Sequence, residues 1–66
     1  MRWTYLQTTL KANKGGPDAD WAVNFMKKHG IPARVSRSVY VDHVDIEVGE
    51  GYKSRAQKLL RPYWDL

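Results

Sequence analysis

Apolar and charged residues alternate with a period of two over residues 35–48, the longest run of strand-forming residues in the chain. Val35, Val39 and Val41 share one parity, whereas Val44, Ile46 and Val48 share the other. This change of parity between Val41 and Val44 requires a break in register. The pattern therefore predicts a β-hairpin with one buried face. Its turn is expected either at 42–43, or near 36–38 with a bulge at 42–43.

A further strand is predicted over residues 2–10, where aromatic and β-branched residues dominate. Alternation places Trp3, Tyr5, Gln7 and Thr9 on one face and Thr4, Leu6, Thr8 and Leu10 on the other. We expect the face with the two leucines to be buried, which leaves Trp3, Tyr5 and Gln7 on an open sheet face. In the alternative, one or both aromatic residues pack in the core or cover a sheet edge.

Residues 17–29 have the apolar period of an amphipathic helix. Pro17 suits the first helical position, and Gly30 is a typical residue just beyond a helix C-terminus. The face expected to be buried contains Ala22, Phe25, Met26 and His29, with Trp21 beside it. The preceding segment, 11–18, is predicted to be a loop in which two consecutive glycines serve a turn.

A second helix is predicted between Ser54 and Pro62. Ser54 and Gln57 have the spacing of a capping box, and proline ends or kinks a helix. The expected apolar stripe is Ala56, Leu59, Leu60 and Tyr63, and the expected polar face is Arg55, Lys58 and Arg61, with Lys53 just before it. Residues 63–66 are expected to form a short final strand or a plug over the edge of the core.

Together these elements predict a single α+β domain of 66 residues with the order β-α-β-β-α, and a short final strand as an option. Matching apolar faces imply a two-layer sandwich with two helices on one face of an antiparallel sheet. This is the split β-α-β, ferredoxin-like pattern. Its open sheet face is expected to be hydrated, to bind a ligand or to form a homodimer.

The charge is distributed unevenly along the chain, which carries 11 Lys and Arg against 7 Asp and Glu, a net charge of +4. Residues 1–34 contribute +4 (6 − 2), residues 35–50 contribute −3 (1 − 4) and residues 51–66 contribute +3 (4 − 1). Such an excess is compatible with a polyanionic partner and is also ordinary for a soluble domain.

The absence of cysteine excludes disulfides and thiolate metal sites. No stretch is long or apolar enough for a signal h-region or a membrane span, so we expect a cytoplasmic protein that does not enter membranes.

The hairpin carries residue types that serve metal binding and acid–base chemistry, namely Asp42, His43, Asp45, Glu47 and Glu50. Side chains on one face of a strand project in parallel and do not converge on a point. A zinc or iron site uses several His or Cys ligands, and this chain has 2 His and no Cys. We therefore predict a solvated strand face and no cofactor. Without a nucleophile–base pair or a phosphate-binding loop, the sequence also indicates no enzymatic activity.

Three segments form a recognisable set: YLQ at 5–7, GIPARV at 30–35 and VGEGYKSR at 48–55. Together they resemble the SPOR domain, the sporulation-related repeat that binds peptidoglycan glycan strands stripped of peptide. Thr8 stands where that family usually has glycine. The resemblance implies the same fold and a glycan ligand, which would contact Gln7 and open-face residues such as Tyr5, Arg34 and Ser36.

Three functional hypotheses follow. The first is a non-enzymatic interaction module that binds or regulates a protein partner. The second is a nucleic-acid binder that uses basic helix faces and strand aromatics, although the acidic hairpin would repel phosphates. The third is the glycan binding that the resemblance implies. The candidate binding residues are Trp3, Tyr5, Gln7, Arg34 and Arg37 on or beside the open sheet face, and Lys53, Arg55, Lys58 and Arg61 on or before the last helix.

Overall fold

The computed structural model describes residues 1–11 and 18–64. Its elements are β1 (Trp3–Leu10), α1 (Ala19–Lys28), β2 (Ala33–Arg37), β3 (His43–Gly49) and α2 (Lys53–Leu60). The predicted order β-α-β-β-α is confirmed. The predicted loop at 11–18 and the expected role of Pro17 lie mostly outside the described residues, as do the last two residues of the tail.

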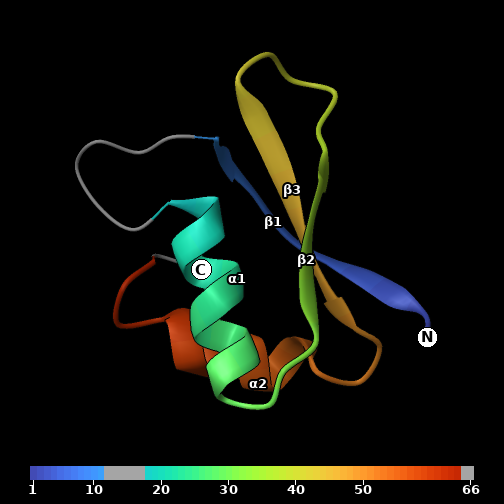
Figure 1. Ribbon diagram of the computed structural model, residues 1–66, viewed down its shortest axis with the longest axis vertical. Helices are drawn as coiled ribbons and strands as arrows, with labels where there is room; N and C mark the ends of the chain where they lie inside the picture. The colour runs from blue at the N-terminus through green and yellow to red at the C-terminus, as the bar shows by residue number, and fades with distance from the viewer. Residues whose placement is uncertain (12–17, 65–66) are drawn as a thin grey trace.

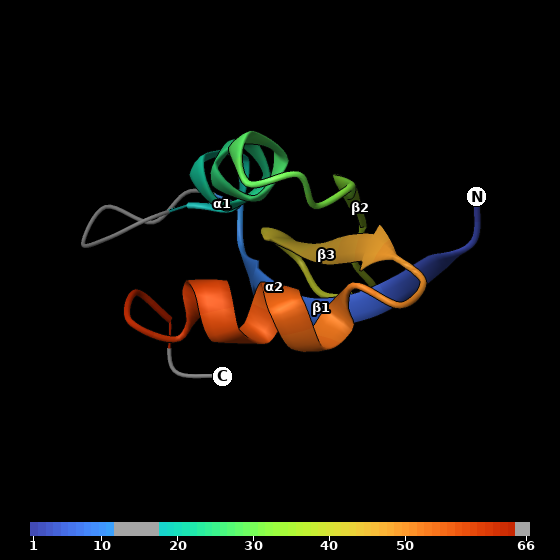
Figure 2. The same cartoon turned by 90° about the horizontal axis from the view of Figure 1, so that it is seen from below.

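The sheet has the strand order β1-β3-β2, and both outer strands pair antiparallel with β3. The two outer strands are therefore parallel to each other with β3 inserted between them, and α1 connects them (Figure 1). This is the split β-α-β arrangement. Figure 2 shows α1 nearly end-on and α2 lengthwise, so the two helices cross at a large angle.

One apolar core joins both helices to one face of the sheet, which confirms the predicted two-layer architecture. Its buried members are Leu6, Ala19, Ala22, Val23, Met26, Ile31, Ala33, Ile46, Val48, Ala56, Leu60 and Trp64. Met26, Ile46, Val48 and Leu60 are the largest side chains that are fully buried. Burying each of them contributes about 1.5–3 kcal/mol, so a few such residues dominate the stability of a domain this small.

Trp64 shows how the described part of the C-terminal tail is used. Its side chain is 8% exposed and belongs to the core. Tyr63 and Trp64 form no strand but continue the turn after α2, where both backbone N–H groups donate to the carbonyl of Leu60. The expected plug over the core is therefore present at Trp64, and the optional strand is absent over residues 63–64.

The turn of the hairpin lies between the two positions that the sequence offered. β2 ends at Arg37 and β3 begins at His43, so residues 38–42 form the loop. Val39 and Val41, expected to share a strand face with Val35, lie in this loop and are 93% and 84% exposed. The expectation was wrong because the break in register comes from the loop itself, in which Asp42 has a positive φ of 59°.

β1 contains a bulge that the sequence did not predict. The pairing with β3 shifts between Tyr5 and Gln7, so that Leu6 is an extra residue. Leu6 is buried as expected, but beyond the bulge the faces are exchanged. Gln7 lies opposite the buried Ile46 and turns toward the helices, whereas Leu10 is 45% exposed. The placement of Gln7 on the open face with Tyr5 was therefore wrong.

Asp18 is the N-cap of α1, which begins at Ala19. Its side chain accepts a hydrogen bond of 2.9 Å from the backbone N–H of Trp21, the arrangement of an N-cap. The helix ends at Lys28 with His29 as its C-cap, and Gly30 follows with φ of 77°, as predicted for the residue after a helix C-terminus.

The predicted capping box at Ser54 is absent. α2 begins at Lys53 after Tyr52, and no side chain caps it. Ser54 therefore lies inside the first turn, where its hydroxyl cannot serve as the N-cap. The expected apolar stripe is otherwise correct in part, since Ala56 and Leu60 are buried and Leu59 is half-buried.

Candidate functional site

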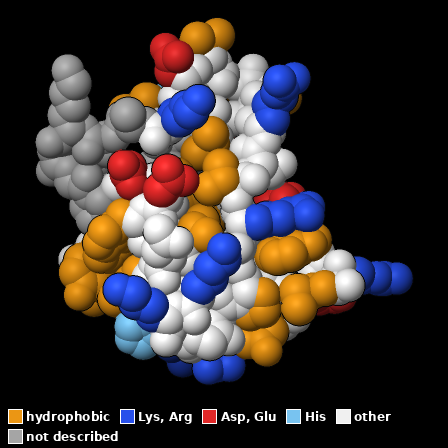
Figure 3. Space-filling view, in the orientation of Figure 1, with side chains coloured by type: hydrophobic (Ala, Val, Ile, Leu, Met, Phe, Trp, Pro, Cys, Tyr) orange, Lys and Arg blue, Asp and Glu red, His pale blue; other side chains and the backbone are white. Residues whose placement is uncertain are grey.

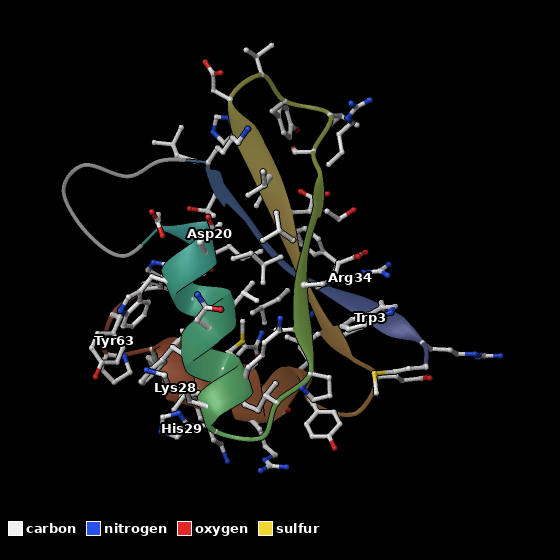
Figure 4. All side chains as sticks on the ribbon, viewed as in Figure 1. Trp3, Asp20, Lys28, His29, Arg34 and Tyr63 are labelled. Atoms are coloured by element: carbon white, nitrogen blue, oxygen red, sulfur yellow. The ribbon has the colours of Figure 1, made fainter. Side chains whose placement is uncertain are left out.

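The open face of the sheet brings together two of the predicted binding residues, Trp3 and Arg34. The guanidinium carbon of Arg34 lies 4.4 Å from the centroid of the Trp3 ring (Figure 4). Its Nε donates to Glu47 Oε1 at 2.7 Å, across the β2–β3 pairing. Arg34 is thus held between an aromatic ring and a carboxylate.

Tyr5, a third predicted residue, belongs to a second group on the same face. The Tyr5 hydroxyl lies 2.8 Å from Thr8 Oγ1. The Thr8 hydroxyl in turn donates a hydrogen bond to Asp45 Oδ1 at 2.6 Å. The polar groups of this face are therefore engaged with each other, and a ligand would have to displace these contacts. Gln7 does not join them, because the bulge turns it toward the helices.

Arg37 also lies apart from the open face. It stands three positions after Arg34 on β2, opposite Val44, so its side chain leaves the sheet on the other side. It is exposed near the end of the strand, where the hairpin loop begins. The sequence-based grouping of Arg37 with Arg34 was therefore wrong.

A groove of about 370 Å³ lies between the C-terminal end of α1 and α2. It is lined by His29, Ile31, Arg55, Lys58 and Leu59. Ile31 is buried and Leu59 is half-buried, so these two form an apolar floor. His29, Arg55 and Lys58 are exposed and form a basic rim. Figure 3 shows Lys, Arg and His side chains gathered at the corresponding end of the molecule.

A row of packed aromatic rings, called the aromatic ladder below, runs along α1 from this groove and consists of Trp21, Phe25, His29 and Tyr63. Trp21 stacks on Phe25 with ring centroids 4.8 Å apart, and the Phe25 and His29 rings pack edge to face with centroids 4.7 Å apart. Tyr63 closes the ladder from the segment after α2, at 5.2 Å from Trp21 and 5.4 Å from Phe25. Figure 4 shows Tyr63, Lys28 and His29 on the same side of α1.

The expected buried stripe of α1 is correct in part, since Ala22 and Met26 are buried and Phe25 is half-buried against the core, whereas His29 is exposed. The buried residues of α1 are Ala19, Ala22, Val23 and Met26. Trp21 and Tyr63 instead remain 37% and 51% exposed. The signal was nevertheless present in the sequence, since Trp21, Phe25 and His29 are spaced four residues apart and therefore share one helix face.

The predicted cations of α2 are all exposed: Lys53, Arg55, Lys58 and Arg61. Within residues 1–11 and 18–64, the one ion pair joins Arg34 to Glu47, so no α2 cation pairs with a carboxylate there. Arg55 lies over the Tyr52 ring at 5.4 Å from its centroid. α2 therefore presents positive charge that the described part of the chain does not neutralise.

The tip of the hairpin is a third exposed surface. Val39, Tyr40 and Val41 are 93%, 65% and 84% exposed, and residues 35–44 together with Lys11 line a hollow of about 610 Å³. Backbone hydrogen bonds hold the tip in place, because the N–H of Lys11 donates to the carbonyl of Asp42 at 2.9 Å. Three consecutive exposed apolar residues are unusual on a soluble surface and are typical of contact sites.

The described residues contain neither a cluster of potential metal ligands nor a membrane-spanning helix. Among them, no group of three or more His, Cys, Asp or Glu side chains is arranged to hold a metal ion. None of the described helices has the length and apolar character needed to cross a membrane. Comparison of the chain with protein-family models, with curated proteins and with solved structures found no match.

Proposed function

We propose that this chain is a non-enzymatic binding module that holds an acidic, partly apolar segment of a protein partner in the groove between α1 and α2. The observation that carries this proposal is the composition of the groove. An apolar floor of Ile31 and Leu59 lies beneath a rim that includes Arg55 and Lys58. In the described part of the chain no carboxylate pairs with these two cations.

Such a groove complements a short peptide with both acidic and aliphatic side chains. Carboxylates of the partner would pair with Arg55 and Lys58, and an aliphatic side chain would cover Leu59. The excess of positive charge on α2 would also accelerate the encounter with an acidic partner, an effect that falls with ionic strength.

The aromatic ladder favours a protein partner over nucleic acid. Single-stranded nucleic acids bind aromatic side chains by stacking bases on free ring faces. Trp21 and Phe25 already stack on each other with an interplanar angle of 17°, and Tyr63 packs edge-on against both rings. The ladder is therefore better suited to lateral apolar contact with a peptide.

The position of Gln7 gives no support to glycan binding. The resemblance to the SPOR domain assigns sugar contact to Gln7 together with open-face residues. In this structure Gln7 lies on the helix side of the sheet, and Tyr5 and Arg34 are engaged within the open face. The α1–α2 groove is the more accessible arrangement of unpaired charge.

Calorimetric titration with a synthetic amphipathic peptide of Glu and Leu tests the proposal. We expect binding that weakens with added salt. Lys58→Glu is expected to weaken it by about tenfold or more, because one charge-assisted contact becomes repulsive. Lys11→Glu is the matched control, since Lys11 is exposed beside the hairpin tip, and its affinity should stay within about twofold of wild type.

Three results would contradict the proposal. The first is the absence of binding at low salt. The second is an equal loss of affinity in the two Lys→Glu variants, which would indicate attraction to net charge alone. The third is tighter binding of a mixed-sequence single-stranded oligonucleotide that is also lost in Lys58→Glu, which would assign the groove to nucleic acid.

A further inference from the structure

The outer edge of β2 is a regular strand edge without a pairing partner in the described part of the chain. The backbone N–H of Gly49 donates to the carbonyl of Pro32 at 3.0 Å, so the backbone groups of Pro32 point toward β3. Along an antiparallel strand, the backbone groups of successive residues point alternately toward and away from the neighbouring strand. The backbone groups of Arg34 and Ser36 therefore also bond to β3. The N–H and C=O groups of Ala33, Val35 and Arg37 therefore point outward from the edge.

The devices that usually protect an edge strand are weak here. Charged side chains and bulges are the common means of preventing edge-to-edge pairing. β1, the other outer strand, carries the bulge at Leu6. β2 keeps regular register through all five residues. Of its two arginines, Arg34 pairs with Glu47 at 2.7 Å, and Arg37 occupies the last position of the strand. The edge of β2 is thus the better template for another strand.

We propose that a second copy of this chain pairs antiparallel with the edge of β2, about a two-fold axis at Val35. In this register Val35 faces Val35 of the second copy, and Ala33 faces Arg37 of the second copy. Each outward N–H of one edge then meets an outward C=O of the other, so that every outward backbone group of β2 is satisfied. The product is a continuous sheet of the order β1-β3-β2-β2-β3-β1.

Side chains are compatible with the same register. Arg34 stands opposite Ser36 of the second copy, so no two arginines are directly opposed across the seam. Val35 is 39% exposed and would contact its own equivalent at the axis.

Self-pairing at β2 is independent of the α1–α2 groove, because the groove involves no residue of β2. Failure of one proposal therefore leaves the other standing. Charge reversal at Lys58 should not change the self-association, and substitution of Val35 should not change the affinity for the acidic peptide.

Sedimentation equilibrium of the full chain over a range of concentrations tests the pairing. Wild type is expected to pass from the mass of one chain, 7.7 kDa, to twice that mass as the concentration rises. Val35→Lys places like charges directly opposite each other at the axis and should remain monomeric. Val35→Thr keeps the β-branched shape and the backbone groups, and it should associate as wild type does.

A mixture of Val35→Lys and Val35→Glu gives the most specific readout. Each variant alone opposes like charges, whereas a heterodimer opposes Lys to Glu. The mixture should therefore recover association that neither variant shows alone. The dimer should also slow amide hydrogen exchange at Ala33, Val35 and Arg37 with rising concentration, while Arg34 and Ser36 stay protected at all concentrations.

The proposal is overturned if wild type remains at the monomer mass up to about 1 mM, the range in which weak specific contacts become populated. It is also overturned if folded Val35→Lys associates as strongly as wild type, or if the charge-complementary mixture stays monomeric. Circular dichroism of each variant identifies any that fails to fold, and the Val35→Thr result and the wild-type exchange pattern decide the question independently of such a variant.

Discussion

Replacing Gln7 with methionine is expected to stabilise the protein. The bulge in β1 turns this side chain toward the helix layer, opposite the fully buried Ile46. Its Oε1 is buried and accepts no hydrogen bond from the described residues. A buried acceptor without a partner costs about 1–3 kcal/mol relative to the solvated unfolded chain. Methionine has a similar length and adapts to irregular gaps, so the substitution removes the acceptor without leaving a large cavity.

The gain should be visible in both thermal and chemical unfolding. For a domain of this size, 1 kcal/mol corresponds to about 4–8 °C in Tm, so Gln7→Met should raise Tm by at least about 4 °C. The urea midpoint should rise with an unchanged m-value. Gln57→Met is the matched control, because Gln57 is a half-buried residue of α2. Its free energy of unfolding should stay within about 0.5 kcal/mol of wild type.

A Gln7→Met variant that is no more stable than wild type would refute this reasoning. It would mean that the amide is satisfied in solution and that its burial carries no penalty. Equal stabilisation by Gln7→Met and Gln57→Met would also refute it, because a general preference for methionine would then explain both results.

Three further substitutions test the packing, the helix cap and the open face. Met26→Ala empties a fully buried position of the core and should lower the free energy of unfolding by about 2–5 kcal/mol in urea titration. Asp18→Ala removes the hydrogen bond to the Trp21 N–H and should cost about 0.5–2 kcal/mol, with faster amide exchange at Trp21. Glu47→Gln should cost less than about 1 kcal/mol in thermal unfolding, because its partner Arg34 is half exposed and solvent screens the pair.

The fold followed from the sequence because each element carried its own local signal. Period-two alternation identified β3, and the stop signal at Gly30 marked the end of α1. These signals depend on neighbouring residues along the chain, which a single sequence displays. The element order and the covering of one sheet face by both helices then followed from the matching apolar faces.

The errors arose where a distant segment decides the local structure. Nothing around Leu6 marks a bulge, since the shift is set by the pairing with β3, and Gln7 was therefore placed on the wrong face. α1 likewise turns Val23 into the core shared with the sheet, while Trp21 stays 37% exposed beside Tyr63, a residue distant in the sequence.

Among the candidate binding residues, those on one helix face were predicted from the sequence, whereas the groove that depends on tertiary packing was not. The cations of α2 were recognised because charged residues at helical spacing reveal an exposed face without tertiary information. The groove was not foreseen, since Ile31 comes from the segment before β2 and Leu59 comes from α2. Only the packing of the two helices brings these side chains together with His29.

The most direct test of the proposed function is an amide NMR titration of the isotope-labelled protein with the Glu and Leu peptide, at low and moderate salt. Shifts concentrated on the groove residues His29, Ile31, Arg55, Lys58 and Leu59, and weaker at moderate salt, are the result that the proposal predicts. Shifts confined to Trp3, Tyr5 and Arg34 on the open sheet face, or no shifts at low salt, would contradict it.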